Sequence, residues 1–357
     1  MASATSAPYD LPSPHPGQRC ALLVALSGLA ACGGPPLQPG AEGRAACPAS
    51  ARARPAAVDP RRPNPAGIDW VALPAGQVTL RDVWDGREER QTVRLRAFEM
   101  SRTEVTNAQY RRCVEAGHCT EAPLRPCVDG RTGKETVDAC PLVGVGLPEA
   151  RMFATWAGGR VPSEAEWQYA ATSAGCDGLY PWGNEPVTCE RAAVRSTLAF
   201  FNTETRQNVD VRTAGCRHAG QRMRVCSHPK GNSAQGLCDL VGNVAERTND
   251  ASGRVVDTPT DGRPAWRFVP RRVREGERVT EPTWAQVQAQ ASFSPLMSPL
   301  EYSPNLYVVR GGSFESMTAW DLVSGTRALQ PWRAKGLAPE LARQLGFRLA
   351  RDASGVR

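Results

Sequence analysis

Gly236-Leu-Cys-Asp-Leu-Val-Gly-Asn-Val-Ala-Glu246 combines acidic residues, glycines and an asparagine in one short segment. Its two carboxylates, Asp239 and Glu246, lie on either side of a Gly-Asn turn. Charged oxygens close to free backbone carbonyls are the ligands that a hard cation such as calcium prefers. A second interpretation is that Asp239 and Asn243 only hydrogen-bond to their own turn, as short polar side chains commonly do. The spacing alone leaves both interpretations open.

The composition around this stretch indicates a loop-rich globular protein. The chain has 357 residues, of which 41% are hydrophobic, and it contains 33 Gly and 30 Pro. This length allows one large domain or two small ones. The formal net charge is +7, but the basic residues are spread along the chain. Because no nucleic-acid motif accompanies them, we expect no nucleic-acid partner.

The N-terminal part predicts export. Residues 20–31 form an apolar run that is too short to span a membrane and has the length of a signal-peptide core. The small residues before Cys32 resemble a bacterial lipobox. We therefore expect a signal peptide at residues 1–31 and a lipid on Cys32, which would anchor the protein to a membrane of the cell envelope, facing the periplasm or the cell surface. An ordinary secretory signal or a buried helix is the alternative. Residues 32–68 are rich in Pro and Gly and predict a tether, so the domain is expected at residues 69–357.

The cysteines agree with export. Of 12 cysteines, Cys20 would be removed and Cys32 lipidated, which leaves ten. An even number in an exported chain favours a disulfide framework. Zinc is the rival interpretation, but the chain has no Cys-x-x-Cys pair. The plausible local pairs are Cys113–Cys119, Cys127–Cys140 and Cys176–Cys189.

Strand and helix signals alternate along the domain. Alternating apolar residues predict strands at Gln77–Leu80 and Val93–Phe98. Helices are predicted to begin at three places, namely the capping boxes Thr106–Gln109 and Ser163–Glu166 and, between them, Pro148. Further strands are predicted around Val308 and Val309 and at Leu345–Ala350, and the polar stretch 250–306 is typical of an insertion or surface loop.

Glu164 and Glu166 could be a pair of catalytic carboxylates. Glu166, however, is explained by the second capping box, and both charges suit the N-terminus of a helix. We therefore favour a structural role for both.

Seven segments, in this order, resemble the formylglycine-generating enzyme (sulfatase-modifying factor) domain family. They span about residues 69–351 and are Phe98–Tyr110, Pro141–Val145, Gly158–Ala171, Tyr180–Asn184, Gly236–Glu246, Val309–Phe314 and Gly346–Leu349. The resemblance implies an irregular α+β fold with little regular secondary structure and a core related to C-type lectins. It also implies a structural calcium ion, held by the side chains of Asp239 and Glu246 and by the backbone carbonyls of Gly242 and Val244.

The chemistry of the family is not carried over so directly. Its formylglycine-forming members bind copper(I) through two cysteines shortly after the Gly-Gly-Ser-aromatic motif, because soft thiolates select this soft ion. The matching positions here are Ser316 and Asp321, and the chain has no cysteine beyond Cys238. Relatives that form sulfur–carbon bonds use histidine-bound iron, but no His-x-x-x-His pattern is present. We therefore expect no copper.

The tryptophans that family members commonly place beside the motif's glutamate are also missing. Ala245 and Arg247 stand there instead, which suggests relaxed constraint or a reshaped pocket nearby.

These observations favour a lipid-anchored binding or scaffold module of the cell envelope, with a protein or glycan ligand and no catalytic residues. The alternative is a metal-dependent oxidoreductase or protein-modifying enzyme of the same family. Its site would be built from other residues, for instance His218, His228, Asp321 and Arg310. Because fold does not determine chemistry, a convergent cluster of redox-metal ligands in one cleft would be needed to favour the enzyme.

Overall fold

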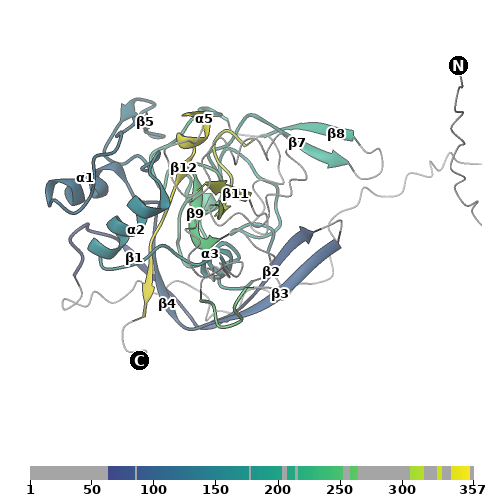
Figure 1. The fold of residues 1–357 in the computed structure, drawn as a ribbon. Coiled ribbons are helices and arrows are strands. Elements are labelled where there is room, and N and C mark those ends of the chain that lie inside the picture. Colours follow the sequence, from purple (N-terminus) through teal and green to yellow (C-terminus); the bar gives the residue numbers. More distant parts are fainter. Residues whose placement is uncertain are drawn as a thin grey trace, which may run out of the picture. The chain divides into compact units, whose positions relative to one another are not determined.

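The computed structural model describes one folded unit (Figure 1). Contacts divide the chain into Met1–Arg44 and Ala45–Arg357, and every described residue belongs to the second unit. The described residues are 63–353, with gaps at 85–86, 177, 203–206, 214–215, 252–257, 264–305, 317–327 and 332–338. The predicted signal peptide, Cys32 and most of the predicted insertion at 250–306 lie outside them. Within this part of the chain, no helix is long and apolar enough to cross a membrane.

Two small sheets join distant parts of the described chain. In the first, β4 lies between β1 and β13, and both pairings are antiparallel. In the second, the strand order is β11-β10-β9-β12, and β12 runs parallel to β9. The strands are β1 (Trp70–Leu73), β4 (Phe98–Ser101), β9 (Ala245–Ala251), β10 (Leu306–Arg310), β11 (Ala328–Pro331), β12 (Leu345–Gly346) and β13 (Ala350–Asp352). The C-terminal strands therefore complete sheets that begin far earlier in the sequence.

Three further pairs of strands form separate two-stranded hairpins. They are β2–β3 (Gly76–Trp84 and Arg87–Leu95), β5–β6 (Cys127–Val128 and Glu135–Thr136) and β7–β8 (Thr197–Asn202 and Gln207–Arg212). The strand predicted at Gln77–Leu80 lies within β2. The strand predicted at Val93–Phe98 is instead divided between β3 and β4, which belong to different sheets.

The helices begin where their caps predict. They are α1 (Asn107–Glu115), α2 (Leu147–Trp156), α3 (Glu164–Ala171) and the short α5 (Pro339–Ala342), with a 3-10 turn η2 at Pro229–Gly231. Thr106 and Ser163 both form complete capping boxes, with Gln109 and Glu166 as the reciprocal partners. The structural role predicted for Glu166 is therefore confirmed.

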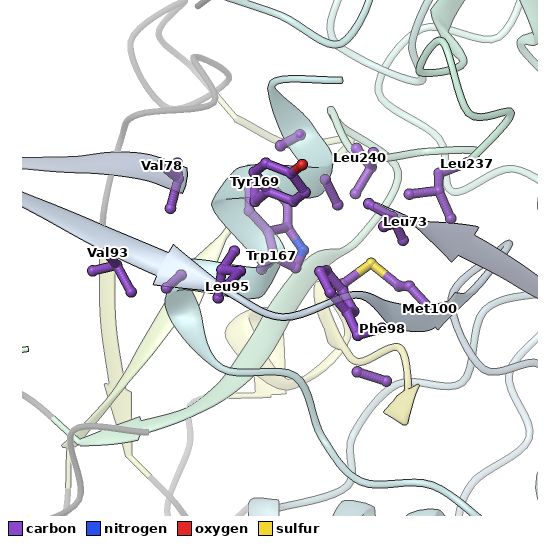
Figure 2. Close-up of a cluster of buried hydrophobic side chains, with 14 of the residues drawn as sticks. Leu73, Val78, Val93, Leu95, Phe98, Met100, Trp167, Tyr169, Leu237 and Leu240 are labelled. Carbon is purple, nitrogen blue, oxygen red and sulfur yellow. The ribbon is translucent and has the colours of Figure 1, made fainter. Parts of the chain in front are cut away.

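The first hydrophobic core lies between the β2–β3 hairpin, β4 and α3 (Figure 2). Trp167 and Tyr169 of α3 contribute its largest side chains, and Phe98 and Met100 of β4 lie in the same cluster. Full burial of such side chains stabilises the fold by about 1.5–3 kcal/mol each. Trp167 is thereby fixed in position, and its indole N–H points toward the polar centre of the domain.

The second core joins α1 and α2 to the C-terminal segment. Phe153 of α2 stacks near Tyr110 and meets Phe347 edge-on, at a centroid distance of 5.8 Å. Ala66 and Ile68 are also buried in this cluster. The packed part therefore begins a few residues before residue 69, where the Pro-rich composition gives no strand or helix signal.

Disulfides fix the loops. Cys113–Cys119 and Cys127–Cys140 form as predicted. The predicted Cys176–Cys189 pair is wrong, because the β7–β8 hairpin folds the chain back and brings Cys216 to Cys189, with the Cα atoms 4.8 Å apart. A fourth bond joins Cys226 and Cys238, and Cys176 is itself disulfide-bonded. Several disulfides in one domain indicate an extracellular or periplasmic protein.

Candidate functional site

The Gly236–Glu246 stretch forms a tight turn at the centre of the domain. Asp239, Gly242 and Asn243 all have positive φ, at 55°, 74° and 55°. Gly242 is required, because a Cβ there would lie 2.4 Å from the carbonyl oxygen of Ala193. Its N–H donates to the carbonyl of Gly311 at 2.9 Å. The two glycine-containing motifs that are separated in the sequence therefore meet in space.

The polar side chains of this turn bind other segments. Asp239 Oδ2 accepts a hydrogen bond from the backbone N–H of Cys226 at 2.6 Å, and Asn243 Oδ1 accepts one from Met223 at 2.9 Å. Asn243 Nδ2 donates to Glu104 Oε1 at 3.1 Å. The interpretation that Asp239 and Asn243 bond only to their own turn is therefore wrong. The polar side chains of the turn therefore bind two other parts of the chain, the segment 223–226 and Glu104.

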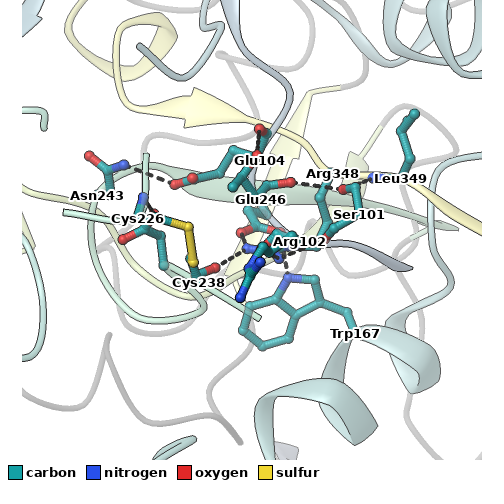
Figure 3. A network of polar contacts seen from close by, with 12 residues as sticks. Ser101, Arg102, Glu104, Trp167, Cys226, Cys238, Asn243, Glu246, Arg348 and Leu349 are labelled. Atoms are coloured by element: carbon teal, nitrogen blue, oxygen red, sulfur yellow. Dashed lines mark hydrogen bonds and ion pairs between the residues drawn. A yellow bond between two sulfur atoms is a disulfide. The ribbon is translucent and has the colours of Figure 1, made fainter. Parts of the chain in front are cut away.

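Glu246, in β9, is the centre of a buried ion pair (Figure 3). Arg348 Nε donates to Glu246 Oε2 and Arg348 Nη2 donates to Oε1, both at 2.6 Å. Trp167 Nε1 donates to Oε2 at 2.7 Å. The parallel pairing of β12 with β9 places Gly346 opposite Glu246, so Arg348 follows two residues later. Arg348 Nη2 also donates to the carbonyl of Cys238, which joins the ion pair to the turn.

The acidic groups here outnumber the base. Glu104, Asp239 and Glu246 are buried, and Arg348 is the cation that faces them. Burial, reinforced by the charges of Asp239 and Glu246, raises the pKa of Glu104 well above its ordinary value. Burial likewise raises the pKa of Asp239 to about 6. Burial alone would lower the pKa of Arg348, but the three carboxylates outweigh it and raise this pKa.

This charge balance fits a bound cation in chemical terms. The predicted calcium ligands, Asp239, Gly242, Val244 and Glu246, lie on one buried segment and offer hard oxygen atoms. Across the described ranges, no group of three or more His, Cys, Asp or Glu side chains is arranged to hold a metal ion. The predicted set uses only two such side chains, so backbone carbonyls would have to supply the rest.

The positions that match the family's copper-binding cysteines have other partners. Ser316 Oγ accepts a hydrogen bond from the N–H of Ser313 at 2.9 Å, and the N–H of Ser316 returns one to the Ser313 carbonyl. Asp321 lies outside the described residues. The nine cysteines in the described part are all disulfide-bonded. This part of the chain therefore contains no thiolate that could bind copper(I).

The residues of the alternative catalytic site occupy different surroundings. Arg310 is fully buried and forms an ion pair with Glu164 of α3. His228 is half-buried beside η2, where burial lowers its pKa to about 4. His218 is half-buried next to Gly133, in the loop before β6. Glu164, one of the two carboxylates considered for catalysis, is the buried ion-pair partner of Arg310.

Arg247 lies beside Glu246 in β9, at one of the two positions where family members commonly have tryptophan. It replaces a family tryptophan, yet it is fully buried in β9, where its Nε donates to the carbonyl of Val145 at 3.2 Å. Burial lowers its pKa to about 10, against the opposing charge of Glu149. Burying a cation is costly unless its surroundings are built for it. Relaxed constraint or a reshaped pocket near this position stays a prediction.

Sequence reasoning missed two central residues, Glu104 and Arg348. Both lie inside segments that carry the family resemblance. Arg348 lies between the apolar Phe347 and Leu349, and Glu104 precedes the apolar Val105. Such a charge in a segment that must be buried is the signal that would have found them, because buried charges occur in pairs.

The chain is similar to known proteins in both sequence and fold. A family model described as "Sulfatase-modifying factor enzyme 1-like domain" matches residues 55–353. The chain is 33% identical over 230 residues to the formylglycine-generating enzyme of Mycobacterium tuberculosis, covering 50% of this chain and 72% of that enzyme. It is 29% identical over 164 residues to the Streptomyces coelicolor enzyme and 30% identical over 207 residues to the Bos taurus enzyme. Those matches cover 32% and 45% of this chain, and 50% and 54% of the two relatives.

Two solved structures share the fold. PvdO from Pseudomonas aeruginosa superposes with a TM-score of 0.50 at 21% identity, covering 84% of this chain and 99% of PvdO. Treponema denticola variable protein 1 gives a TM-score of 0.50 at 18% identity, covering 79% and 95% of the two chains. At these identities the similarity is one of fold. It agrees with the mixed helix and sheet architecture and irregular sheets described above.

Proposed function

Because the chain belongs to the sulfatase-modifying factor enzyme 1-like domain family, we propose that it is a member without copper chemistry that acts as a lipid-anchored binding or scaffold module of the cell envelope. The residues between Cys32 and the packed part, which begins near Ala66, would hold the domain away from the membrane to which Cys32 is anchored. The partner would be a protein or a glycan.

One observation supports the absence of copper chemistry. The positions of the copper ligands are Ser316 and Asp321, and no cysteine follows Cys238. Hydroxyl and carboxylate groups are hard ligands and do not select copper(I). The Ser316 hydroxyl is, in addition, engaged in closing its own turn. Formylglycine formation by a copper thiolate therefore lacks its ligands in this chain.

We further propose that calcium is a structural component. The family motif would assign its ligands to the side chains of Asp239 and Glu246 and the backbone carbonyls of Gly242 and Val244. The excess of carboxylates over guanidinium groups in this buried region supports a divalent cation. Such an ion would fix the turn and so stabilise its contact with Gly311. It would not take part in a reaction.

Metal analysis of the exported, purified chain tests the first part of this proposal. We expect close to one calcium per chain and neither copper nor iron in stoichiometric amount. Incubation with copper(I), oxygen and a cysteine peptide from a sulfatase should give no aldehyde product. Stoichiometric copper or iron, or aldehyde formation, would refute the proposal of a non-enzymatic module and favour the metal-dependent enzyme.

Lipid labelling tests the anchor. Cells expressing the wild-type chain should incorporate labelled fatty acid into the protein, and Cys32→Ser should abolish the label and release the protein from membranes. Cys20→Ser is the matched control, because that cysteine would be lost with the signal peptide. Equal labelling of the wild type and Cys32→Ser would refute the lipobox. Cross-linking in intact cells would then identify the partner, with Cys32→Ser showing whether the anchor is needed to reach it.

A further inference from the structure

Glu104 is a buried carboxyl group that the family-derived calcium ligands do not include. It follows β4 and precedes the cap of α1, and it has no exposed surface. Its Oε1 accepts the hydrogen bond from Asn243 Nδ2, which Figure 3 shows. Its Oε2 is buried and has no hydrogen-bond donor in the described part of the chain. A buried carboxylate oxygen without a donor calls for a proton or a cation.

The position of Glu104 brings it to the same turn as the proposed ligands. Asn243, which it binds, stands between Gly242 and Val244, whose carbonyls are proposed to bind calcium. The Glu104 carboxyl group is also within hydrogen-bonding reach of Asp239. Two acidic side chains therefore lie together at the turn that contains Gly242 and Val244.

The carboxylate oxygens of Glu246, in contrast, already accept hydrogen bonds from other residues. Its Oε2 accepts hydrogen bonds from both Arg348 and Trp167, and its Oε1 accepts one from Arg348. A carboxylate oxygen has two lone pairs, so Oε2 is saturated and Oε1 has one acceptor position left. The guanidinium group also repels a second cation at this place. Glu246 is thus a poor calcium ligand, although the family motif assigns it that role.

We propose that Glu104 and Asp239 are the two carboxylate ligands of the cation in this chain, and that Glu246 serves as the partner of Arg348. This assignment rests on the proposed calcium site and changes its ligand set. It agrees with the arrangement of the described residues, in which no three acidic side chains converge to hold a metal. It also balances the region: Arg348 offsets Glu246, and a divalent cation offsets Glu104 and Asp239.

Terbium and calcium titration of the full chain, stripped of metal with a chelator, tests the assignment. Terbium occupies calcium sites, and Trp167 beside Glu246 would sensitise its luminescence. Glu104→Gln keeps the side-chain size and the contact with Asn243 but removes the charge. We expect it to weaken terbium and calcium binding at least about tenfold, since affinity follows the ligand charge count. It should also abolish the calcium-induced rise in Tm.

Glu166→Gln is the matched control. Glu166 is also buried, but it binds Ser163 and Arg160 outside the site, so this variant should bind the cation as the wild type does. Glu246→Gln gives a second comparison, because it should lower Tm through the lost Arg348 pair while changing the cation affinity less than Glu104→Gln does.

Wild-type affinity in Glu104→Gln would overturn the assignment and show that Glu104 holds only a proton and Asn243. A greater loss of affinity in Glu246→Gln would restore the family's ligand set. If the wild type binds neither cation, both the calcium site and this assignment fall. The absence of copper chemistry would still stand or fall on the aldehyde assay.

Discussion

Replacing Arg348 with Met should remove the interaction that organises the centre of the domain. Arg348 is fully buried and makes both of its short ion-pair contacts with Glu246. Removing one partner of a buried pair typically costs about 3–5 kcal/mol, because the other charge stays buried without compensation. Arg348 also donates to the carbonyl of Cys238 at 2.8 Å, and an unsatisfied buried group costs a further 1–3 kcal/mol or so. We therefore expect a loss of at least about 4 kcal/mol.

Urea unfolding followed by tryptophan fluorescence, with the disulfides intact and calcium held constant, measures this loss. With an m-value of about 3 kcal/mol/M, the midpoint should fall by more than about 1 M. Arg343→Met is the matched control, because the Arg343–Glu315 pair is 47% exposed on the arginine side and such surface pairs contribute about 0–1 kcal/mol.

A double variant, Arg348→Met with Glu246→Met, separates the pair from its surroundings. Replacing both charges by apolar groups should recover part of the loss, since no buried charge is left alone. The reasoning is refuted if Arg348→Met costs no more than Arg343→Met. It is equally refuted if the two single losses simply add in the double variant.

Three further predictions concern the same region. Cys226→Ser with Cys238→Ser, which opens a disulfide with a sequence separation of 12, should cost about 3 kcal/mol by the chain-entropy relation; an unchanged thermal midpoint would contradict this. In chelator, Asp239→Asn should be more stable than the wild type at pH 7, and the difference should vanish toward pH 4. The reason is that the raised pKa of Asp239, about 6, makes the folded state bind its proton first as the pH falls; a pH-independent difference would count against a buried ionised carboxylate. The pKa of His228 is lowered to about 4, so the unfolded state binds the proton first and the free energy of unfolding should fall as the pH drops from about 6.5 to 4. His228→Asn should remove that part of the pH dependence in thermal melts.

Local signals in the sequence predicted local structure well. Thr106 and Ser163 began helices where their capping boxes indicated, because a cap is complete within four residues. The disulfides with separations of 6 and 13 were predicted for the same reason. The family motifs identified the fold because seven of them occur in one order, which no single local pattern could show.

Long-range pairing could not be predicted in this way. Cys216 reaches Cys189 only because an intervening hairpin folds back, and no spacing rule encodes that hairpin. Arg348 and Glu246 are 102 residues apart and meet through a two-residue parallel pairing. The burial of Arg247 was likewise invisible, because an arginine in a polar sequence context is exposed far more often than buried.

The late arrival of Arg348 sets an order of events for a nascent chain. Glu104, Asp239 and Glu246 all emerge from a ribosome or an export channel long before the guanidinium that neutralises one of them. Until then, burial of the Gly236–Glu246 turn is costly, because these carboxylates would leave water without the guanidinium group that pairs with Glu246. The interior can therefore be buried only after the last strands have been synthesised. A chain that ends just before residue 345 would keep its helix caps and local disulfides, but it would lack Arg348 and could not bury the carboxylates at its centre. Proteases that sample such unfinished chains would find the acid-rich turn open, and resistance to them would report completed synthesis.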